Sequence, residues 1–249
     1  MNALANKSTT LLVLTATVDP GQCPNVAIRD PDVRLRQYLA SWRRWLQLAE
    51  QSCVDLLLLE NSAADLDLFL RCVDADRATA CGVRAQSVPS SPKTLTRGKG
   101  AGEAALLDSL HAFDLGQYRV IAKATGRLVV SNLPKTLQAL PEGPFVRCRF
   151  RAGLDAIDSR YFVLDRANFL VAATGRSDDV DERSNKYLEH ALASAFLKRI
   201  SAGLRRQDFP TAPRFLGVSG STGVSYRSVR TDLRDRVANW QHRHPNAYV

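Results

Sequence analysis

The sequence predicts an α/β fold: a mostly parallel sheet with helices on both faces, plus a smaller region near the C-terminus. Residues 11–17 and 54–60 are continuous apolar runs of strand length, as expected for strands that are buried on both faces. Between these runs, residues 33–52 place apolar side chains at three- and four-residue spacing, which is typical of an amphipathic helix. Because strands alternate with helices up to about residue 130, we expect the strands to pair in parallel.

The remaining elements are predicted from the same patterns. Asp32 is the expected N-cap of the first helix, and Ser62 is the expected N-cap of a second helix over residues 63–73. Residues 90–102, rich in serine, proline, lysine and glycine, are expected to form a loop. Further strands are predicted over residues 82–88, 118–124, 127–130, 145–150, 160–164 and 215–218, and further helices over residues 103–113, 185–203 and 228–242. The strands between residues 145 and 164 are expected to form a second, antiparallel region.

The charge balance predicts an acidic partner. The chain of 249 residues carries a net charge of +9, which favours nucleic acid, an anionic membrane surface or a phosphorylated ligand. The arginines are spread along the chain without a block of five basic residues, and no aromatic–basic repeat occurs. Both observations argue against a specific nucleic-acid module. We therefore expect a phosphorylated ligand, together with peripheral contact with an anionic membrane.

Cysteine spacing and hydropathy argue against two further classes. The five cysteines are scattered and form no CxxC pair, so neither a zinc site nor a disulfide framework is expected. The longest apolar runs are far shorter than the roughly 20 residues that span a bilayer. The first ten residues are polar and show no signal peptide, so the expected location is the cytoplasm.

Polar and basic segments follow the predicted strands at one edge of the sheet. Ligands of open α/β sheets bind at the carboxyl ends of the strands. Residues 97–103, RGKGAGE, combine backbone freedom with two cations directly before a predicted helix, an arrangement that suits a phosphate. A lysine inside an apolar strand, such as Lys123, needs a partner, which makes it a candidate functional residue. The segments at this edge are residues 15–19, 60–62, 88–102 and 123–127.

On these residues the sequence resembles bacterial glycosyltransferases that build capsules, O-antigens and other surface polysaccharides on a nucleotide-diphospho-sugar, or GT-A-like, fold. The resemblance covers residues 11–225 and follows the order expected for that family. The matching segments are LTATVDP, RDPDVRLRQYLASWRRWL, LLLLENSA, RGKGAGEA, AKATGRLVVSN, KYLEHALASAF and LGVSGSTG.

The resemblance implies one domain over residues 1–249. Residues 8–132 would be its nucleotide-sugar-binding half, residues 133–225 its acceptor-side half and residues 226–249 a basic C-terminal helix. It also places the nucleotide base and ribose near the first strand end, with the second strand end beside them. The expected donor-binding residues are Thr15, Thr17, Asp19, Glu60, Asn61, Lys99, Gly100, Gly102, Lys123, Thr125, Gly126 and Arg127.

The resemblance further implies an acidic residue near the start of the helix over residues 185–203, facing the acceptor. An inverting transferase needs a base that deprotonates the attacking hydroxyl as the glycosyl bond breaks. Glu189 is the first candidate and His190 the second, since two adjacent helix residues do not share a face. Asp158, with Asp155, is a further acidic candidate in a loop that would border the acceptor site.

One departure from the family concerns the metal. These enzymes commonly carry Asp-x-Asp after the fourth strand, which holds a divalent cation on the donor diphosphate. Here the corresponding residues are Ala124, Thr125, Gly126 and Arg127, so no cofactor is predicted, and a divalent metal is left open. Our hypothesis is that Lys99, Lys123 and Arg127 neutralise the diphosphate instead.

The sequence therefore predicts a metal-independent, inverting glycosyltransferase. Its partners would be a nucleotide-sugar donor and a glycan acceptor, the latter expected to be lipid-linked, with the enzyme in the cytoplasm or peripheral at the inner membrane. Two alternatives remain: a nucleotidyltransferase of sugar activation, and a non-catalytic protein that binds anions or nucleic acid. The first usually needs a carboxylate pair, and the second is motivated by a pI of about 9.6.

Overall fold

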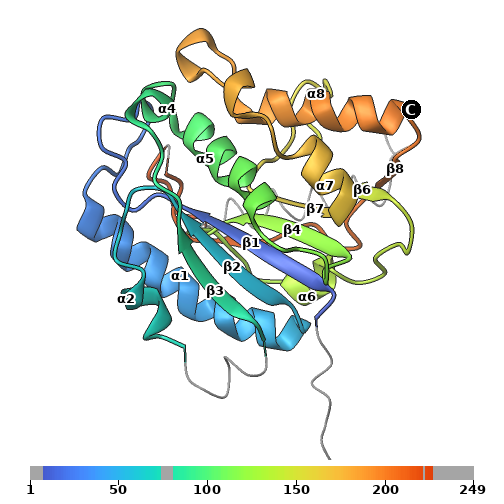
Figure 1. The fold of residues 1–249 in the computed structure, drawn as a ribbon, viewed down its shortest axis with the longest axis horizontal. Helices are drawn as coiled ribbons and strands as arrows, with labels where there is room; N and C mark the ends of the chain where they lie inside the picture. The colour runs from blue at the N-terminus through green and yellow to red at the C-terminus, as the bar shows by residue number, and fades with distance from the viewer. Residues whose placement is uncertain (1–7, 74–80, 221, 227–249) are drawn as a thin grey trace, which may run out of the picture.

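The computed structural model describes residues 8–73, 81–220 and 222–226 (Figure 1). Within these residues, seven strands form one sheet in the order β3-β2-β1-β4-β7-β6-β8, and β5 and β9 form a separate antiparallel pair. The strands are β1 (Thr10–Ala16), β2 (Asp55–Glu60), β3 (Val83–Ser87), β4 (Val120–Thr125), β5 (Val129–Val130), β6 (Phe145–Arg147), β7 (Tyr161–Asp165), β8 (Arg205–Gln207) and β9 (Phe215–Leu216).

The sheet is mostly parallel. Strands β3, β2, β1 and β4 run parallel to one another, and β6 runs parallel to β8, whereas β7 is antiparallel to both β4 and β6. The antiparallel strand predicted near residue 160 is therefore confirmed. It does not begin a second sheet, because β7 bonds directly to β4 and extends the first sheet.

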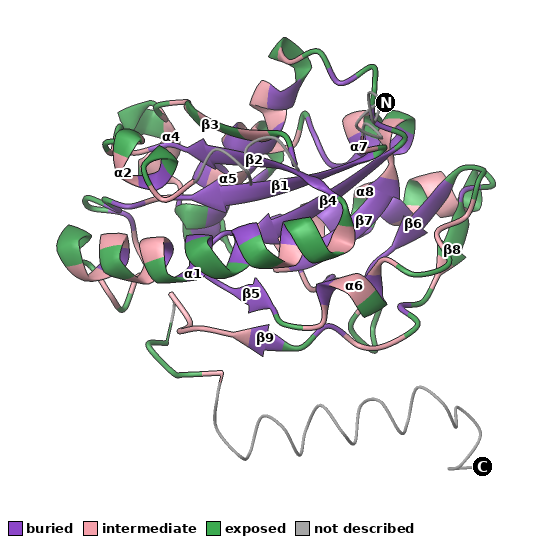
Figure 2. Ribbon diagram, turned by 90° about the horizontal axis from the view of Figure 1, so that it is seen from below, coloured by how far each residue is buried: buried purple, intermediate pink, exposed green. Residues whose placement is uncertain are grey.

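Helices cover both faces of this sheet (Figures 1 and 2). Helices α1 (Pro31–Ser52), α2 (Asp67–Leu70) and α6 (Leu133–Thr136) lie on one face, where the β5–β9 pair also packs. Helices α5 (Lys99–Asp108), α7 (Arg166–Ala172) and α8 (Leu188–Ser201) lie on the other, with α4 (Pro92–Thr96) beside α5. The predicted fold class, a mostly parallel sheet with helices on both faces, is confirmed.

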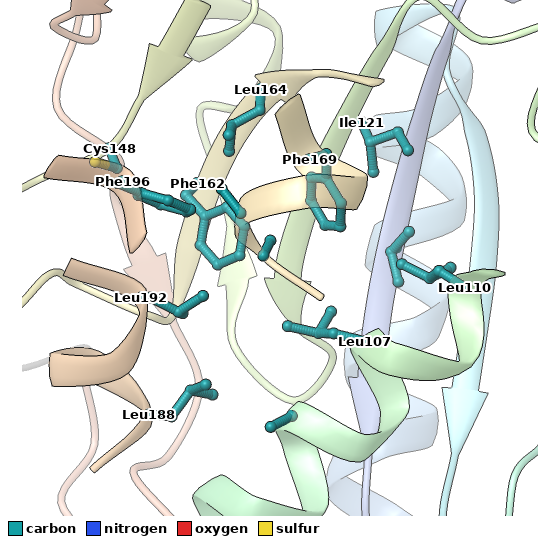
Figure 3. Close-up of a cluster of buried hydrophobic side chains, with 14 of the residues drawn as sticks. Leu107, Leu110, Ile121, Cys148, Phe162, Leu164, Phe169, Leu188, Leu192 and Phe196 are labelled. Atoms are coloured by element: carbon teal, nitrogen blue, oxygen red, sulfur yellow. The ribbon is translucent and has the colours of Figure 1, made fainter. Parts of the chain in front are cut away.

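The alternation of side chains along β1 explains the two cores. Leu12 and Leu14 face the cluster beneath α1, and Leu11 and Val13 face the cluster beneath α5, α7 and α8. Figure 3 shows the second cluster, in which Phe162 of β7 stacks on Phe169 of α7 with ring centres 5.7 Å apart. A strand segment that is buried on both faces favours apolar residues at every position, which is why Leu11–Leu14 of β1 are continuously apolar.

The segment predicted as a loop over residues 90–102 is largely helical. It contains α4, and α5 begins at Lys99 rather than at residue 103; the rest of the predicted helix forms a 3-10 turn over Ser109–Ala112. Glycine is unfavourable inside a helix, but here close packing requires it. A Cβ atom at Gly100 would lie 2.9 Å from the Glu182 carboxylate, and one at Gly102 would lie 2.9 Å from Asn61.

Other predicted boundaries also differ. The N-cap of α1 is Asp30, whose carboxylate accepts from the N–H groups of Asp32 and Val33, because Pro31 fills the first helical position. Ser62 does not cap α2, which spans four residues and begins after Leu66. The helix predicted over residues 185–203 begins at Leu188. The helix predicted over residues 228–242 lies outside the described residues.

The described residues include no helix that combines the length and the apolar character required to cross a bilayer.

Packing of α1 fixes the end of β4. The indole nitrogen of Trp45 is fully buried and donates to the carbonyl oxygen of Gly126 at 2.9 Å. Replacing Trp45 with phenylalanine would leave this carbonyl without its partner, so we expect the free energy of unfolding to fall by about 1–3 kcal/mol. Urea denaturation followed by circular dichroism measures the change. Arg43→Gln on the exposed side of the same helix is the control and should stay within about 0.5 kcal/mol of wild type; equal stabilities for the two variants would contradict the assignment.

Candidate functional site

A cavity of about 630 Å³ lies at the carboxyl end of β4. Its walls come from α5, the β4–β5 turn, the hairpin of residues 149–158 before β7, the start of α8 and the segment that follows β9. The lining residues are Lys99, Glu103, Thr125, Arg127, Leu128, Arg149, Phe150, Arg151, Ile157, Asp158, Ser159, Arg160, Glu189, Ser219, Gly220 and Tyr226. The ligand-binding edge predicted from the strand ends is thus hollowed.

A smaller cavity of about 50 Å³ shares Lys99, Arg127 and Gly220 with the first. It extends toward the ends of β1 and β2. Its other lining residues are Thr17, Pro20, Cys23, Val26, Arg34, Asn61, Leu95 and Gly102. We refer to the two spaces as the large cavity and the small cavity.

A buried ion pair joins β4 to α5 beneath the large cavity. The ammonium group of Lys123 is fully buried and lies 2.5 Å from a carboxylate oxygen of Glu103. The same oxygen accepts hydrogen bonds from the hydroxyls of Thr15 at 2.6 Å and Thr125 at 3.3 Å. Lys123 also donates to the carbonyl oxygen of Ser159 at 2.6 Å. Lys123 is therefore enclosed by protein partners and is not among the residues that line the cavity, contrary to its predicted contact with the donor.

The pKa of Glu103 reflects this pairing. Burial alone would raise the pKa, but the Lys123 charge and the hydrogen bonds from Lys123, Thr15 and Thr125 outweigh it and hold the pKa below its ordinary value. Glu103 is therefore charged at neutral pH, and its charge is balanced by Lys123. It is a carboxylate on the cavity wall that the sequence analysis did not single out.

Arg127 is a buried cation whose charged group lacks full pairing. Only 6% of the residue is exposed, and its Nε and Nη1 atoms have no hydrogen-bond partner within the described part of the chain. The guanidinium lies 5.8 Å from the centre of the Tyr38 ring and directly against Gly220, where a Cβ atom would come within 1.9 Å of Nη2. Since an unpartnered buried donor is costly, an anion in the adjoining cavities is the partner this geometry suits.

Gly126 supports the position of Arg127 through its backbone. Its N–H donates to the carbonyl oxygen of Thr15 at 2.9 Å, and a Cβ atom would lie 3.0 Å from that same oxygen. Glycine is needed here for the close approach of the β4 end to β1. Gly126 does not line either cavity, so its part in a donor site is limited to holding Arg127 in place.

The N-terminus of α5 is occupied by the protein's own carboxylate. Glu182, which is buried, accepts from the backbone N–H of Gly100 at 2.9 Å, and its own N–H donates to the carbonyl oxygen of Arg97 at 2.8 Å. Gly98 has a φ of +124°, and a Cβ atom there would lie 2.6 Å from the Glu182 carboxylate. Burial raises the pKa of Glu182, partly offset by Gly100 and Lys99. The N–H of Gly100 is therefore already used, contrary to its predicted contact with a phosphate, whereas Gly102 lines the small cavity.

Thr17 and Asn61 form one wall of the small cavity. The Thr17 hydroxyl donates to Asn61 Oδ1 at 2.7 Å, and Asn61 Nδ2 donates to the Ser90 hydroxyl at 3.1 Å. The buried Arg34 guanidinium donates from Nε to the carbonyl oxygens of Thr17 and Val18 at 3.0 and 3.1 Å. These contacts fix the polar atoms that a ligand would meet there. Thr15, by contrast, lines neither cavity and acts through Glu103.

Glu60 organises the loops after β1 and β2 rather than facing a cavity. It is fully buried, and its oxygens accept from the N–H groups of Val18, Ser62 and Ala64 at 2.9–3.1 Å and from the Ser62 hydroxyl. Asp19 is exposed and accepts from the N–H of Gly21 at 2.8 Å. Neither residue lines the large or the small cavity, so the structure does not bring them to a ligand as the sequence analysis expected.

Of the four candidates, Glu189 has the most suitable position, whereas Asp155 does not line the large cavity. Its carboxylate lines the large cavity and accepts from the Ser159 hydroxyl at 2.7 Å. His190 packs against Tyr187, with ring centres 5.6 Å apart, and does not line that cavity. Asp158 lines it, but both of its oxygens accept from the Arg160 guanidinium at 2.7 and 2.6 Å.

Arg160 connects the hairpin to the C-terminal part of the described chain. Burial alone would raise the pKa of Asp158, but Arg160 outweighs it and holds the pKa below the ordinary range. The Arg160 guanidinium also lies 4.2 Å from the ring centre of Phe215 and 5.1 Å from that of Tyr226. Asp158 is thus a fixed counter-ion, which makes it a poor proton acceptor.

The residues at the end of β4 do not suit a divalent cation. Within the described ranges no group of three His, Cys, Asp or Glu side chains could hold a metal ion. The side chains of this segment that reach the cavity are those of Thr125 and Arg127, and the unpartnered guanidinium of Arg127 would repel a cation.

Comparisons with known proteins give low similarities. No family model matches the chain, and no curated protein matches it. Among solved structures, a nucleotide-diphospho-sugar transferase candidate from Desulfovibrio desulfuricans G20 shares 13% identity over 81% of this chain and 80% of its own, with a TM-score of 0.45. The galactosyltransferase LgtC, in complex with donor and acceptor sugar analogs, shares 8% identity over 75% of this chain and 70% of its own, also with a TM-score of 0.45. HddC from Yersinia pseudotuberculosis shares 10% identity over 94% of this chain and 99% of its own, with a TM-score of 0.39.

Several residues of the site were not singled out from the sequence. Glu103 could have been anticipated, because Lys123 in an apolar strand requires a buried partner and Glu103 follows the glycine-rich segment. The others carry no sequence pattern that separates them from ordinary surface or loop residues. They are Arg34, Arg149, Arg151, Ser159, Arg160 and Glu182.

The Lys123–Glu103 pair is expected to be energetically coupled. Lys123→Met leaves Glu103 without its counter-ion and should lower the free energy of unfolding by about 3–5 kcal/mol. Adding Glu103→Gln removes the unpaired charge and should recover about 0.5–3 kcal/mol of that loss. The free energies of unfolding of wild type, the two single variants and the double variant, measured by urea denaturation, form a double-mutant cycle. Additive effects of the two substitutions would show that the pair is not coupled.

The same pair has a pH signature. The pKa of Glu103 is lower in the folded protein than its ordinary 4.5, so its stabilisation is present above that value and is lost as pH falls through the folded pKa. The double variant should therefore lose less stability than wild type below about pH 4.5.

Proposed function

We propose that this protein is a glycosyltransferase that moves a sugar from a nucleotide-sugar donor to a hydroxyl group of a glycan acceptor. The observation that carries the proposal is the buried, incompletely paired guanidinium of Arg127, which lines both the large and the small cavity at the carboxyl end of β4. An anion at this junction would have space on both sides. The diphosphate of a nucleotide sugar is such an anion, with a nucleoside at one end and a sugar at the other.

The donor would extend from Arg127 in two directions. Its nucleoside would point toward the small cavity, where Thr17 and Asn61 present fixed polar atoms. Its sugar would occupy the large cavity, near Thr125 and Glu103. Lys99 lines both cavities, so it would contact the diphosphate together with Arg127. Of the three cations expected to neutralise the diphosphate, Lys99 and Arg127 remain in this proposal. Lys123 does not, because it is enclosed by Glu103 and Ser159.

The reaction follows from the positions of these groups. The acceptor hydroxyl attacks the anomeric carbon, the bond from that carbon to the diphosphate oxygen breaks, and Glu189 takes the hydroxyl proton. Arg127 and Lys99 offset the charge that develops on the leaving diphosphate. Direct displacement of this kind inverts the configuration at the anomeric carbon. Glu189 is suited to the base role because Ser159 donates to one of its oxygens and fixes its orientation.

The wider setting is part of the proposal. An enzyme with a net charge of +9 that acts on lipid-linked glycans in bacterial surface polysaccharide synthesis would work at the cytoplasmic side of the inner membrane. The basic segment expected to contact lipid lies outside the described residues.

Nucleotide binding is the first test. A thermal-shift panel of UDP, GDP, CMP, ADP and dTDP, each in EDTA and in Mn²⁺, should show one clear rise of the melting temperature in EDTA. Arg127→Gln should weaken binding of that nucleotide by about 10- to 100-fold, because a charged hydrogen bond is lost. Arg43→Gln is the control of equal charge change. A rise in Mn²⁺ alone would exclude metal independence, and no rise with any nucleotide would favour the anion-binding alternative.

The base is tested by Glu189→Gln, which keeps the shape but removes the proton acceptor. We expect sugar transfer from the donor identified by the panel to fall by about 10²- to 10⁴-fold, with nucleotide affinity unchanged. Asp155→Asn in the hairpin turn, outside the cavity lining, is the matched control. Transfer by Glu189→Gln at the wild-type rate would exclude Glu189 as the base.

A further inference from the structure

The hairpin before β7 presents two arginines to the large cavity. Phe150 pairs with Ile157, the N–H of Arg151 donates to the carbonyl oxygen of Ala156 at 2.8 Å, and the N–H of Asp158 donates to that of Arg149 at 2.8 Å. The side chains of Arg149 and Arg151, two positions apart in this ladder, both line the cavity. We call residues 149–158 the arginine hairpin.

The arginine hairpin is tied to the candidate base. The N–H of Ile157 donates to the carbonyl oxygen of Glu189 at 3.2 Å, and the Ser159 hydroxyl, directly after the hairpin, donates to the Glu189 carboxylate. The two arginines are thus carried by a segment whose backbone is fixed relative to Glu189. A group bound by them would have a defined position relative to the reacting hydroxyl.

The charges on the cavity wall do not balance. Its carboxylates are Glu103, Asp158 and Glu189, of which Glu103 is paired with Lys123 and Asp158 with Arg160. In residues 8–73, 81–220 and 222–226, neither Arg149 nor Arg151 forms an ion pair with a carboxylate. Two cations on the hairpin side therefore face the cavity in addition to Lys99 and Arg127.

A further space adjoins the large cavity beside Arg149. A further cavity of about 140 Å³ shares Arg149 and Phe150 with it. Its other lining residues are Cys148, Arg206, Asp208, Phe209 and Ala212. Arg206 lies 5.2 Å from the ring centre of Phe150 and 3.8 Å from the Asp208 carboxylate. Arg149 thus lines both spaces.

We propose that the acceptor is an acidic saccharide whose carboxylate or phosphate group is bound by Arg149 and Arg151. This rests on the proposed function, because it treats the hairpin side of the cavity as the acceptor side. Guanidinium groups bind carboxylate and phosphate oxygens through paired N–H donors, which suits them to fix an anionic substituent. The donor diphosphate does not need these arginines, since Arg127 and Lys99 line the cavity that extends toward the nucleoside end.

The test measures binding of simple anionic and neutral sugars to the full chain. The probes are glucuronate, galacturonate, N-acetylneuraminate, glucose 6-phosphate and inorganic phosphate, with glucose and galactose as neutral controls. Thermal shift ranks them, and calorimetry gives the dissociation constants. The variants are Arg149→Gln/Arg151→Gln and, as a control of equal charge change outside the three cavities, Arg43→Gln/Arg205→Gln.

We expect at least one anionic sugar to bind more tightly than the neutral sugars, and the hairpin double variant to weaken that binding by about 10- to 100-fold. The control double variant should keep the wild-type affinity. A preference for uronates over glucose 6-phosphate identifies a carboxylate as the recognised group, and the reverse identifies a phosphate. Equal binding of anionic and neutral sugars, or equal loss in both double variants, would overturn the proposal.

The nucleotide panel separates this proposal from the proposed function. If a nucleotide binds and no acidic sugar does, the acceptor proposal alone fails. If acidic sugars bind through the arginine hairpin and no nucleotide binds, the transferase proposal fails and the hairpin remains an anion site. Binding of inorganic phosphate alone, without any sugar, would overturn the assignment to a saccharide.

Discussion

The ion pair between Lys123 and Glu103 is the interaction on which the site depends most. Lys123 stands in the middle of the sheet, fully buried, and a charge in that position is tolerated only with a close counter-ion and hydrogen bonds. Glu103 supplies the counter-ion and draws the hydroxyls of β1 and β4 to the same oxygen. Through the carbonyl of Ser159, the same lysine also reaches the residue whose hydroxyl orients Glu189. One pair thus fixes the cavity wall at β4 and the candidate base relative to each other.

Internal charges also explain which cations are open to a ligand. The N-terminus of α5 is satisfied by Glu182, Lys123 by Glu103, and Arg160 by Asp158. Each of these groups could bind an anion if its internal partner were absent. Arg127 differs, because two of its nitrogen atoms are buried without a partner in the described structure. Pairing therefore distinguishes Arg127 from the cations that have a structural partner.

The sheet could be predicted from the sequence because strands buried on both faces leave a continuous apolar pattern, as in β1 and β2. The edge that carries the cavity could be predicted for the same reason, since it follows from parallel pairing. The long-range hydrogen-bond partners within the site could not be predicted. Glu182 lies 82 residues from Gly100, and Glu103 lies 88 from Thr15, and no local pattern reports such contacts. Glycines at 100 and 102 were interpreted as a flexible loop, whereas close packing against Glu182 and Asn61 is what excludes a side chain there.

The segment after β9 forms the wall of the site that lies next to the β4–β5 turn. Gly220 lies against Arg127. The rings of Phe215 and Tyr226, which precede and follow Gly220 in the sequence, both lie close to the Arg160 guanidinium. During synthesis on the ribosome, the Lys123–Glu103 pair can form once β4 has emerged, but the pocket around Arg127 has no outer wall until residues 215–226 follow, some ninety positions later. The part of the sheet from β3 to β4 can therefore form before Arg127 is enclosed, whereas β7, β6 and β8 lie between these two stages in the sequence.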